Sequence, residues 1–501
     1  MGKQQHRWEF GMSHDLVIRG ARVIDPETGL DAVRDVGVTG GKITAISTEP
    51  LAAARTIEAA GLVLCPGFID LHSHAQSRGG LALQALDGVT TALDLEAGSA
   101  SVAASLALDA EEGRPINFGY SASWLLNRMV LMDGVEPLRP LEMFSAYHGL
   151  SNWKRPASSY EQGRILDAVR AEVAAGGIGI GVLVGYAPDS GRAEYFALAE
   201  LAARLGVPTF THTRFISTEE PGTSLEGALE VIAAASGTGA HMHMCHLNST
   251  SNRMIDTIAG AVEHAKAEGV RITTEAYPYG SGSTVIGADF LAPEKLHRMG
   301  MTPDMVRYLP TGEWVADAAR LAELRSTDPG GQVIMKWADE RDEADREVLL
   351  RSLLLPDSAI ASDAAPPNVP GKPKLHDEWP FPDSAMVHPR STSCFAHTFG
   401  WLVRELEVLS LTEAVRRCTL LPAQFLAEAA PAMREKGRIQ VGADADIVVF
   451  DPETIAQRGD YDTLAPSEGV RHLLVGGERV VTDGEVRVDS TAGKPVTGRG
   501  C

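Results

Sequence analysis

One stretch constrains the fold of this chain more than any other: Pro66-Gly-Phe-Ile-Asp-Leu-His-Ser-His74. An apolar run from 63 to 69, broken by the Pro-Gly step, predicts entry into a buried strand. Because side chains alternate faces along a strand, we expect Asp70, His72 and His74 to point the same way. Two imidazoles on one face, two residues apart, suit a divalent metal of the zinc, iron or manganese type.

Seven further strand-like runs follow this stretch and alternate with helical stretches, as a parallel β/α fold requires. They begin at Val89, Ile116, Ile178, Pro208, Ala240, Ile272 and Ala359. Eight such units predict an α/β protein with a closed (β/α)8 TIM barrel over 66–428 and a site at the C-terminal strand ends. Residues 280–357 are too long for one crossover, so we expect an inserted subdomain or lid there.

Short strand-like runs separated by turns occupy both ends of the chain, over 14–65 and 430–490. Isolated hairpins are unstable in water, so these runs need one another as sheet partners. We therefore expect a small composite β-sandwich domain built from both ends, with the barrel inserted between its halves.

The composition restricts the partners and the compartment. A formal net charge of -21 argues against a basic surface that would bind nucleic acid or an anionic membrane. Five widely spaced cysteines are not a disulfide framework and favour a reducing compartment. Residues 1–13 are polar and lack an apolar signal core, so we expect a cytoplasmic protein that binds a small molecule. A homo-oligomer is left open.

Three more residues are predicted to join the two histidines. His212 and His246 each end an apolar run, and successive strand ends meet at the barrel mouth. Asp363 follows the last run, where a carboxylate can bind a metal and accept a proton from water. If His246 faces inward, the alternation turns His241 and His243 toward the helices.

A carboxylate is chemically suited to bridge two metals, because it binds each cation through one oxygen. The second run offers Asp94 and Glu96 on one face. Glu96 lies nearer the C-terminal end, so we predict that it bridges. The alternative is that it only supports a ligand and that one metal is bound.

Several motifs occur in a fixed order along residues 14–485. They are Asp87-Gly-Val-Thr-Thr, Val184-Gly-Tyr-Ala-Pro, Thr211-His-Thr-Arg, Cys245-His-Leu, Ala276-Tyr-Pro-Tyr, His388-Pro-Arg-Ser and Val441-Gly-Ala-Asp-Ala-Asp-Ile-Val-Val-Phe-Asp. Together they resemble the D-aminoacylase (N-acyl-D-amino-acid deacylase) group of the amidohydrolase superfamily. The resemblance implies hydrolysis of an amide by water that bound metal activates.

The resemblance also implies roles for individual residues. Tyr186 and Arg390 match positions that hold the substrate carboxylate, a role suited to the planar donors of arginine. Arg214 either meets the substrate or pairs with an acid. The positions that match the family's ligands to one or two zinc or other divalent ions are His72, His74, His212, His246 and Asp363.

Two departures from the family pattern bear on the site. Ala97 stands where the family usually has a cysteine ligand, and Glu96 lies one residue before it. Asn248 stands where the family tends to have a lysine that binds the substrate carboxylate. A neutral amide has replaced a cation, which points to a substrate whose carboxylate is placed differently or is absent. Asn248 remains a candidate substrate-binding residue.

The sequence favours a metal-dependent hydrolase that cleaves a linear amide, such as an N-acyl amino acid, with Asp363 as the catalytic proton carrier. The rivals are a cyclic amidase or imidase of the hydantoinase or dihydroorotase kind, a deaminase, and a non-catalytic scaffold of the same fold. In much of the superfamily that this chain resembles, a carboxylated lysine on the fourth strand bridges the metals. The fourth run, over 177–186, contains no lysine, which argues against the cyclic amidases. The complete set of histidines and Asp363 argues against the scaffold.

Overall fold

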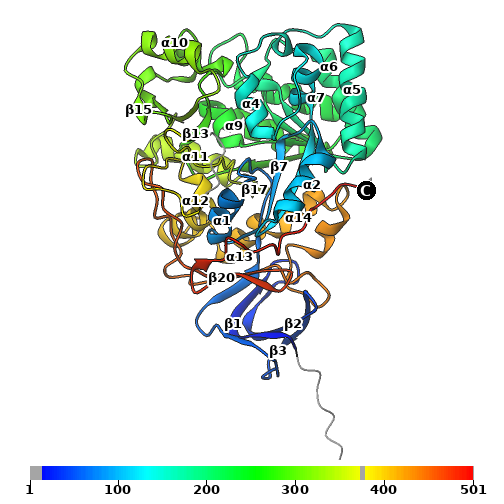
Figure 1. The fold of residues 1–501 in the computed structure, drawn as a ribbon, viewed down its shortest axis with the longest axis vertical. Coiled ribbons are helices and arrows are strands. Elements are labelled where there is room, and N and C mark those ends of the chain that lie inside the picture. The colour runs from blue at the N-terminus through cyan, green and yellow to red at the C-terminus, as the bar shows by residue number, and fades with distance from the viewer. Residues whose placement is uncertain (1–13, 373–378, 500–501) are drawn as a thin grey trace, which may run out of the picture.

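The computed structural model describes residues 14–372 and 379–499. The polar leader expected over 1–13 lies outside the described residues. In Figure 1 the barrel and its helices form the larger body, and a β-sheet from both chain ends lies below it. Within the described ranges, no helix has the length and apolar character needed to cross a membrane.

The expected eight-stranded parallel barrel is confirmed. Its strands lie in the order β6-β7-β8-β9-β10-β11-β12-β17. A parallel bridge between Ser73 and Ala364 brings the two edges together just beyond the ends of β6 and β17. The bounds are β6 Phe68–Asp70, β7 Val89–Ser99, β8 Asn117–Ser123, β9 Ile180–Leu183, β10 Thr209–His212, β11 Met242–Met244, β12 Ile272–Ala276 and β17 Ser358–Ile360.

Helices cover the outside of the barrel, and two of them begin with a capping box. Ser158 caps α5 together with Glu161, and Thr223 caps α7 together with Glu226. These helices are α1 Arg78–Leu86, α2 Val102–Glu112, α3 Trp124–Arg128, α4 Pro140–Tyr147, α5 Ser159–Ala174, α6 Arg192–Leu205, α7 Ser224–Thr238, α8 Leu247–Ser251, α9 Ile255–Ala267, α11 Glu343–Leu353, α12 Arg390–His397, α13 Leu411–Cys418 and α14 Leu420–Leu426. Helix α10, Ala318–Thr327, lies in the inserted region instead (Figure 1).

The β domain expected from both chain ends is confirmed and consists of one nine-stranded sheet. The strands of the two ends meet where β5 pairs with β18. We propose that this domain covers 14–65 and 430–490 and the barrel 66–428. The strands are β1 Leu16–Asp25, β2 Leu30–Thr39, β3 Lys42–Ser47, β4 Thr56–Glu58, β5 Val63–Pro66, β18 Ile447–Phe450, β19 Val470–Val475, β20 Glu478–Thr482 and β21 Glu485–Val486.

A small antiparallel sheet separates β12 from β17, within the region 280–357. Its order is β13-β16-β14-β15, with β13 at Ser281–Val285, β14 at Val306–Tyr308, β15 at Glu313–Trp314 and β16 at Gln332–Lys336. The charged residues that come after β16 form α11, which packs against α9 and β17. That helix therefore completes the barrel crossover, and the inserted sheet precedes it. We propose that the sheet forms the lid.

The last described residues return from the small domain to the barrel. Pro495 bridges to Phe118 of β8, and the side chain of Val496 joins Ile69, Leu93 and Phe210 in one buried cluster. The segment thus adds an apolar side chain to the inside of the barrel after β21 has ended.

Asp446 joins the small domain to the barrel through a buried carboxylate. Its Oδ2 accepts hydrogen bonds from Lys436 Nζ at 2.6 Å and from Asn117 Nδ2 of β8 at 2.9 Å. Its Oδ1 accepts from the backbone N–H of Gly476 at 2.7 Å. One side chain therefore satisfies donors from three segments that are far apart in the sequence.

We predict that Asp446→Ala lowers the free energy of unfolding by about 3 kcal/mol, because it leaves buried donors without their acceptor. Urea unfolding measures the change. Asp167→Ala is the matched control, since that exposed aspartate forms only a surface ion pair with Arg170 and should change stability by about 0.5 kcal/mol or less. Equal effects of the two substitutions would contradict the bridging role.

Candidate metal centre

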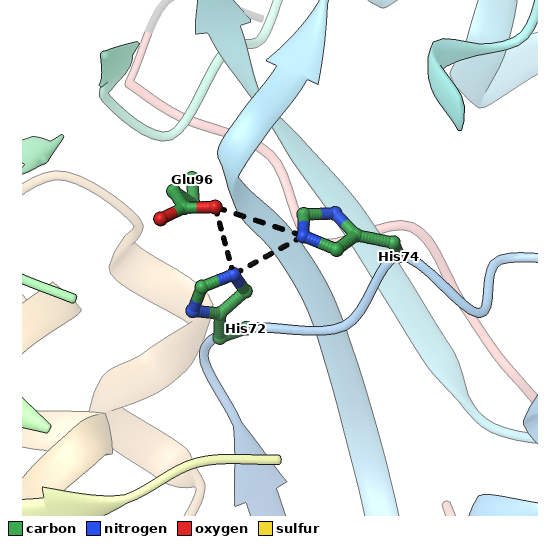
Figure 2. A group of neighbouring side chains, drawn as sticks. All are labelled: His72, His74 and Glu96. Atoms are coloured by element: carbon green, nitrogen blue, oxygen red, sulfur yellow. Dashed lines mark hydrogen bonds and ion pairs between the residues drawn. The ribbon is translucent and has the colours of Figure 1, made fainter. Parts of the chain in front are cut away.

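Six predicted site residues come together at the C-terminal ends of the barrel strands. The side chains of His72, His74, Glu96, His212, His246 and Asp363 converge there. Glu96 is on β7 and His212 ends β10, whereas the other four lie just past their strands. Figure 2 shows how Glu96 and two of the histidines point toward one another.

Glu96 lies between two pairs of histidines. Its Oε1 is 2.8 Å from His246 Nε2 and 3.2 Å from His212 Nδ1. Its Oε2 is 3.1 Å from His72 Nε2 and 3.7 Å from His74 Nε2 (Figure 2). Each oxygen of one carboxylate therefore faces one pair of imidazoles.

Asp363 closes the cluster on the side of His72 and His74. Its Oδ1 is 3.4 Å from His72 Nε2 and 3.5 Å from His74 Nε2. Its Oδ2 forms an ion pair with Nη2 of the buried Arg390 at 2.8 Å. One oxygen of this carboxylate thus faces the histidines while the other is held by the guanidinium.

The buried charges shift the pKa values of these groups strongly. Burial alone would lower the pKa of His72, but the carboxylates of Glu96, Asp363 and Glu275 raise it well above its ordinary value. Burial would raise the pKa of Glu96, yet the nearby histidines, His72 first, hold it well below its ordinary value. The pKa of Asp363 is lowered against the effect of burial, chiefly by Arg390.

The donor set fits divalent metal. The Nε2 atoms of His72 and His74 lie only 3.1 Å apart, and Nε2 of His212 is buried without a hydrogen-bond partner among the described residues. Within each of the triads His72–His74–Glu96, His72–His246–Asp363 and Glu96–His212–His246, the candidate ligand atoms lie within 4.8 Å of one another. Imidazole nitrogens and carboxylate oxygens in such groups are ligands that zinc accepts.

The simple alternation of side chains fails at two strand ends. His246 and Asp363 have φ values of 33° and 52°, in the left-handed region that residues other than glycine seldom adopt. His246 reaches the site through this turn, and His243 of β11 also faces the inside of the barrel, where it contacts Glu275 and Phe210. The expectation that His241 and His243 face the helices is therefore wrong for His243.

Asp70 does not join the histidines, contrary to the expectation that it points with them. Strand β6 ends at Asp70, and its carboxylate accepts hydrogen bonds from Ser362 Oγ and from Gln84 Nε2 of α1. Burial raises the pKa of Asp70 to about 6. Its role is to connect the ends of β6 and β17 below the site.

Two carboxylates hold the histidines from behind, and the sequence did not single out the first of them. Glu275 Oε1 lies 2.6 Å from His72 Nδ1, and its Oε2 lies 3.1 Å from His243 Nε2. Asp94 Oδ1 lies 3.1 Å from His74 Nδ1. Both histidines therefore present Nε2 to the centre. A charged residue inside the apolar run 272–276 is the signal that could have indicated Glu275.

Tyr186 and Arg390 line the pocket above the histidines. Tyr186 follows β9 in a short helix, where a Cβ on Gly185 would lie 2.3 Å from the His212 ring. Only glycine allows this close approach. Arg390 begins α12 and lies with its guanidinium carbon 4.7 Å from the centre of the Tyr277 ring.

The other two predicted substrate-binding residues do not line this pocket. Arg214 is buried in a bidentate ion pair with Glu230 and also donates to the backbone oxygens of Pro188 and Ser190. Asn248 donates to the backbone oxygens of Tyr277 and Tyr279. Arg214 thus takes the acid-pairing alternative, and Asn248 supports the loop after β12.

Comparisons with known proteins agree with this geometry. The sequence profile described as the amidohydrolase family matches residues 55–481. The N-acyl-D-glutamate deacylase of Alcaligenes xylosoxydans xylosoxydans is 30% identical over 92% of this chain and 93% of that protein. The D-aminoacylase of the same organism is 27% identical over 93% and 94%.

A solved structure shows the same fold. The crystal structure of N-acyl-D-glutamate deacylase from Bordetella bronchiseptica, complexed with zinc and a phosphonate inhibitor, is 24% identical to this chain. It covers 97% of this chain and 100% of its own, with a TM-score of 0.74. Since the profile and a relative at 30% identity both match most of its length, this chain belongs to the amidohydrolase family, whose members are metal-dependent hydrolases of amide C–N bonds.

Proposed function

We propose that this protein hydrolyses the linear amide of an N-acyl amino acid. Two relatives carry names for this kind of reaction, N-acyl-D-glutamate deacylase and D-aminoacylase. The observation that carries the proposal is the position of Glu96 between two pairs of histidines, with Asp363 and Arg390 beside them. This arrangement supports a metal site with a proton carrier and one cation beside it.

The residues that would hold metal are His72, His74, Glu96, His212, His246 and Asp363. Zinc is the proposed ion, because the related Bordetella structure is complexed with zinc and the donors here are imidazoles and carboxylates. Bound divalent metal supplies Lewis acidity, which lowers the pKa of water and polarises a carbonyl oxygen. Glu96 is proposed to bridge, since each of its oxygens faces a different pair of histidines.

Asp363 is proposed to carry the proton of the reaction. Arg390 keeps its carboxylate ionised, and Oδ1 is directed at the histidines, where water would be activated. Oδ1 can therefore accept a proton from the attacking water and return it to the nitrogen of the leaving amine.

Arg390 and Tyr186 are proposed to bind the carboxylate of the substrate. Nε and Nη1 of Arg390 are buried and have no hydrogen-bond partner among the described residues, so two donors remain for an anion. The Tyr186 hydroxyl is 2.7 Å from Thr284 Oγ1 at the same pocket. Asn248 and Arg214 are left out of this role because their polar atoms bind the protein itself.

The small-molecule substrate and the compartment complete the proposal. The four described cysteines are buried free thiols, and the chain carries a formal net charge of -21. Both properties support a cytoplasmic enzyme that acts on a small amide rather than on nucleic acid. The absence of lysine from β9 and from the short helix Val184–Tyr186 after it supports a linear amide over a cyclic one.

We predict that Asp363→Asn lowers kcat on N-acetyl amino acids by about 1,000-fold, because the side chain loses its proton-accepting oxygen. Zinc-supplemented protein is assayed by mass spectrometry of the products, and zinc content and thermal unfolding are measured on the same sample. Asp167→Asn, an exposed position, should leave turnover unchanged. Near-normal turnover of the Asp363 variant would refute the role.

We predict that Glu275→Ala weakens zinc binding by about 10- to 100-fold, because His72 loses the acceptor that fixes its tautomer. Glu275→Gln keeps an acceptor oxygen for His72 and should weaken binding less. Competition with a chromophoric chelator gives the dissociation constants, and the visible spectrum of the cobalt-substituted protein reports the ligand field. Glu263→Ala, at a half-exposed position on α9, is the control. Unchanged affinity in all three variants would show that Glu275 is only structural.

A further inference from the structure

Aromatic rings form one wall of the pocket above the proposed metal centre. The Tyr186 ring centre lies 5.0 Å from that of Phe144 and 5.6 Å from that of Phe290. Phe290 in turn stacks on His212 at 6.0 Å with an angle of 13°. The apolar surface therefore begins directly beside a histidine of the cluster.

The inserted sheet extends this apolar wall. Val285 ends β13, Met335 lies on β16, and Trp337 follows it, and all three line the pocket and are largely buried. Val285 and Met335 offer neither a cation nor a hydrogen-bond donor, and Trp337 offers only its indole N–H. The part of a substrate that lies against Val285 and Met335 has to be apolar to replace the water there without loss of hydrogen bonds.

Arg390 is the only lysine or arginine among the described residues that line the pocket. One of its nitrogens, Nη2, is already engaged by Asp363, so Nε and Nη1 are its remaining donors. Lys336 is the next residue after Met335, but its Nζ lies 4.1 Å from the centre of the Tyr461 ring and 4.9 Å from that of Trp314. This ammonium group therefore points to a different surface.

We infer that the substrate carries one carboxylate and an apolar side chain, and that the pocket rejects N-acyl derivatives of glutamate and aspartate. The inference rests on the proposed function and separates this chain from its relative named for N-acyl-D-glutamate. A second carboxylate would be buried against Phe290, Met335 or Trp337 without a cation, and an unpaired buried charge is strongly unfavourable.

The test compares kcat/KM for zinc-supplemented protein on both enantiomers of N-acetyl-leucine, N-acetyl-methionine, N-acetyl-phenylalanine, N-acetyl-glutamate and N-acetyl-aspartate. We expect the better enantiomer of at least one apolar substrate to exceed both acidic substrates by about 100-fold or more. Equal or faster cleavage of N-acetyl-glutamate would overturn the inference and leave the proposed function intact.

A matched pair of substitutions tests the wall itself. Met335→Lys places a cation on the pocket wall and should raise the ratio of acidic to apolar kcat/KM by about 10-fold or more. Met305→Lys adds the same charge at a partly exposed position of the inserted region and should leave the ratio unchanged. The same ratio in both variants and in the wild type would contradict the placement of the substrate against Met335.

If no amide is cleaved, the proposed function is refuted, but the inferred preference for an apolar side chain can still be tested by binding. The test is isothermal titration of the zinc-loaded protein with N-acetyl-leucine and with N-acetyl-glutamate. Tighter binding of the leucine derivative supports an apolar, singly charged ligand. Equal or tighter binding of the glutamate derivative overturns it.

Discussion

The pairing of buried carboxylates with histidines around Glu96 is the interaction on which the rest of the site depends. Glu96, Asp363 and Glu275 are buried, and each has at least two histidines or an arginine within 3.5 Å. A buried charge without such partners is unfavourable by several kcal/mol. The partners come from different strands, so the charges are compensated only when the barrel closes and its strand ends meet.

Backbone strain at two of these strand ends follows from the same requirement. His246 and Asp363 adopt left-handed conformations that cost on the order of 1–3 kcal/mol each. Contacts beyond the backbone hold both: Ser249 Oγ lies 3.1 Å from His246 Nδ1, and Arg390 pairs with Asp363. The turns direct these two side chains into the cluster from positions where regular strand geometry would not place them. This strain is a cost of assembling six donors in one place.

The sequence predicted the eight strands and the six clustered residues because both depend on local patterns. Apolar runs mark buried strands, and a polar residue just after such a run lies at the barrel mouth. The direction of His243 could not be predicted, since it depends on the left-handed turn at His246 that breaks the alternation. The pairing of Arg214 with Glu230 and the support of His72 by Glu275 depend on contacts between separate elements.

Asn248 bears both on the charge of the pocket and on the loop that lines it. The family tends to have a lysine at this position, directed at the substrate carboxylate, whereas the Asn248 amide here binds the backbone of the loop that carries Tyr277 and Tyr279. Arg390 is thereby left as the pocket's cation among the described residues, and its Nη2 also donates to the backbone oxygen of Ser283 on β13. The group proposed to bind the carboxylate is therefore anchored to the sheet that supplies the apolar wall. A change in the inserted sheet would move both parts of the pocket together, so the substrate range can diverge here while the barrel and its histidines stay the same.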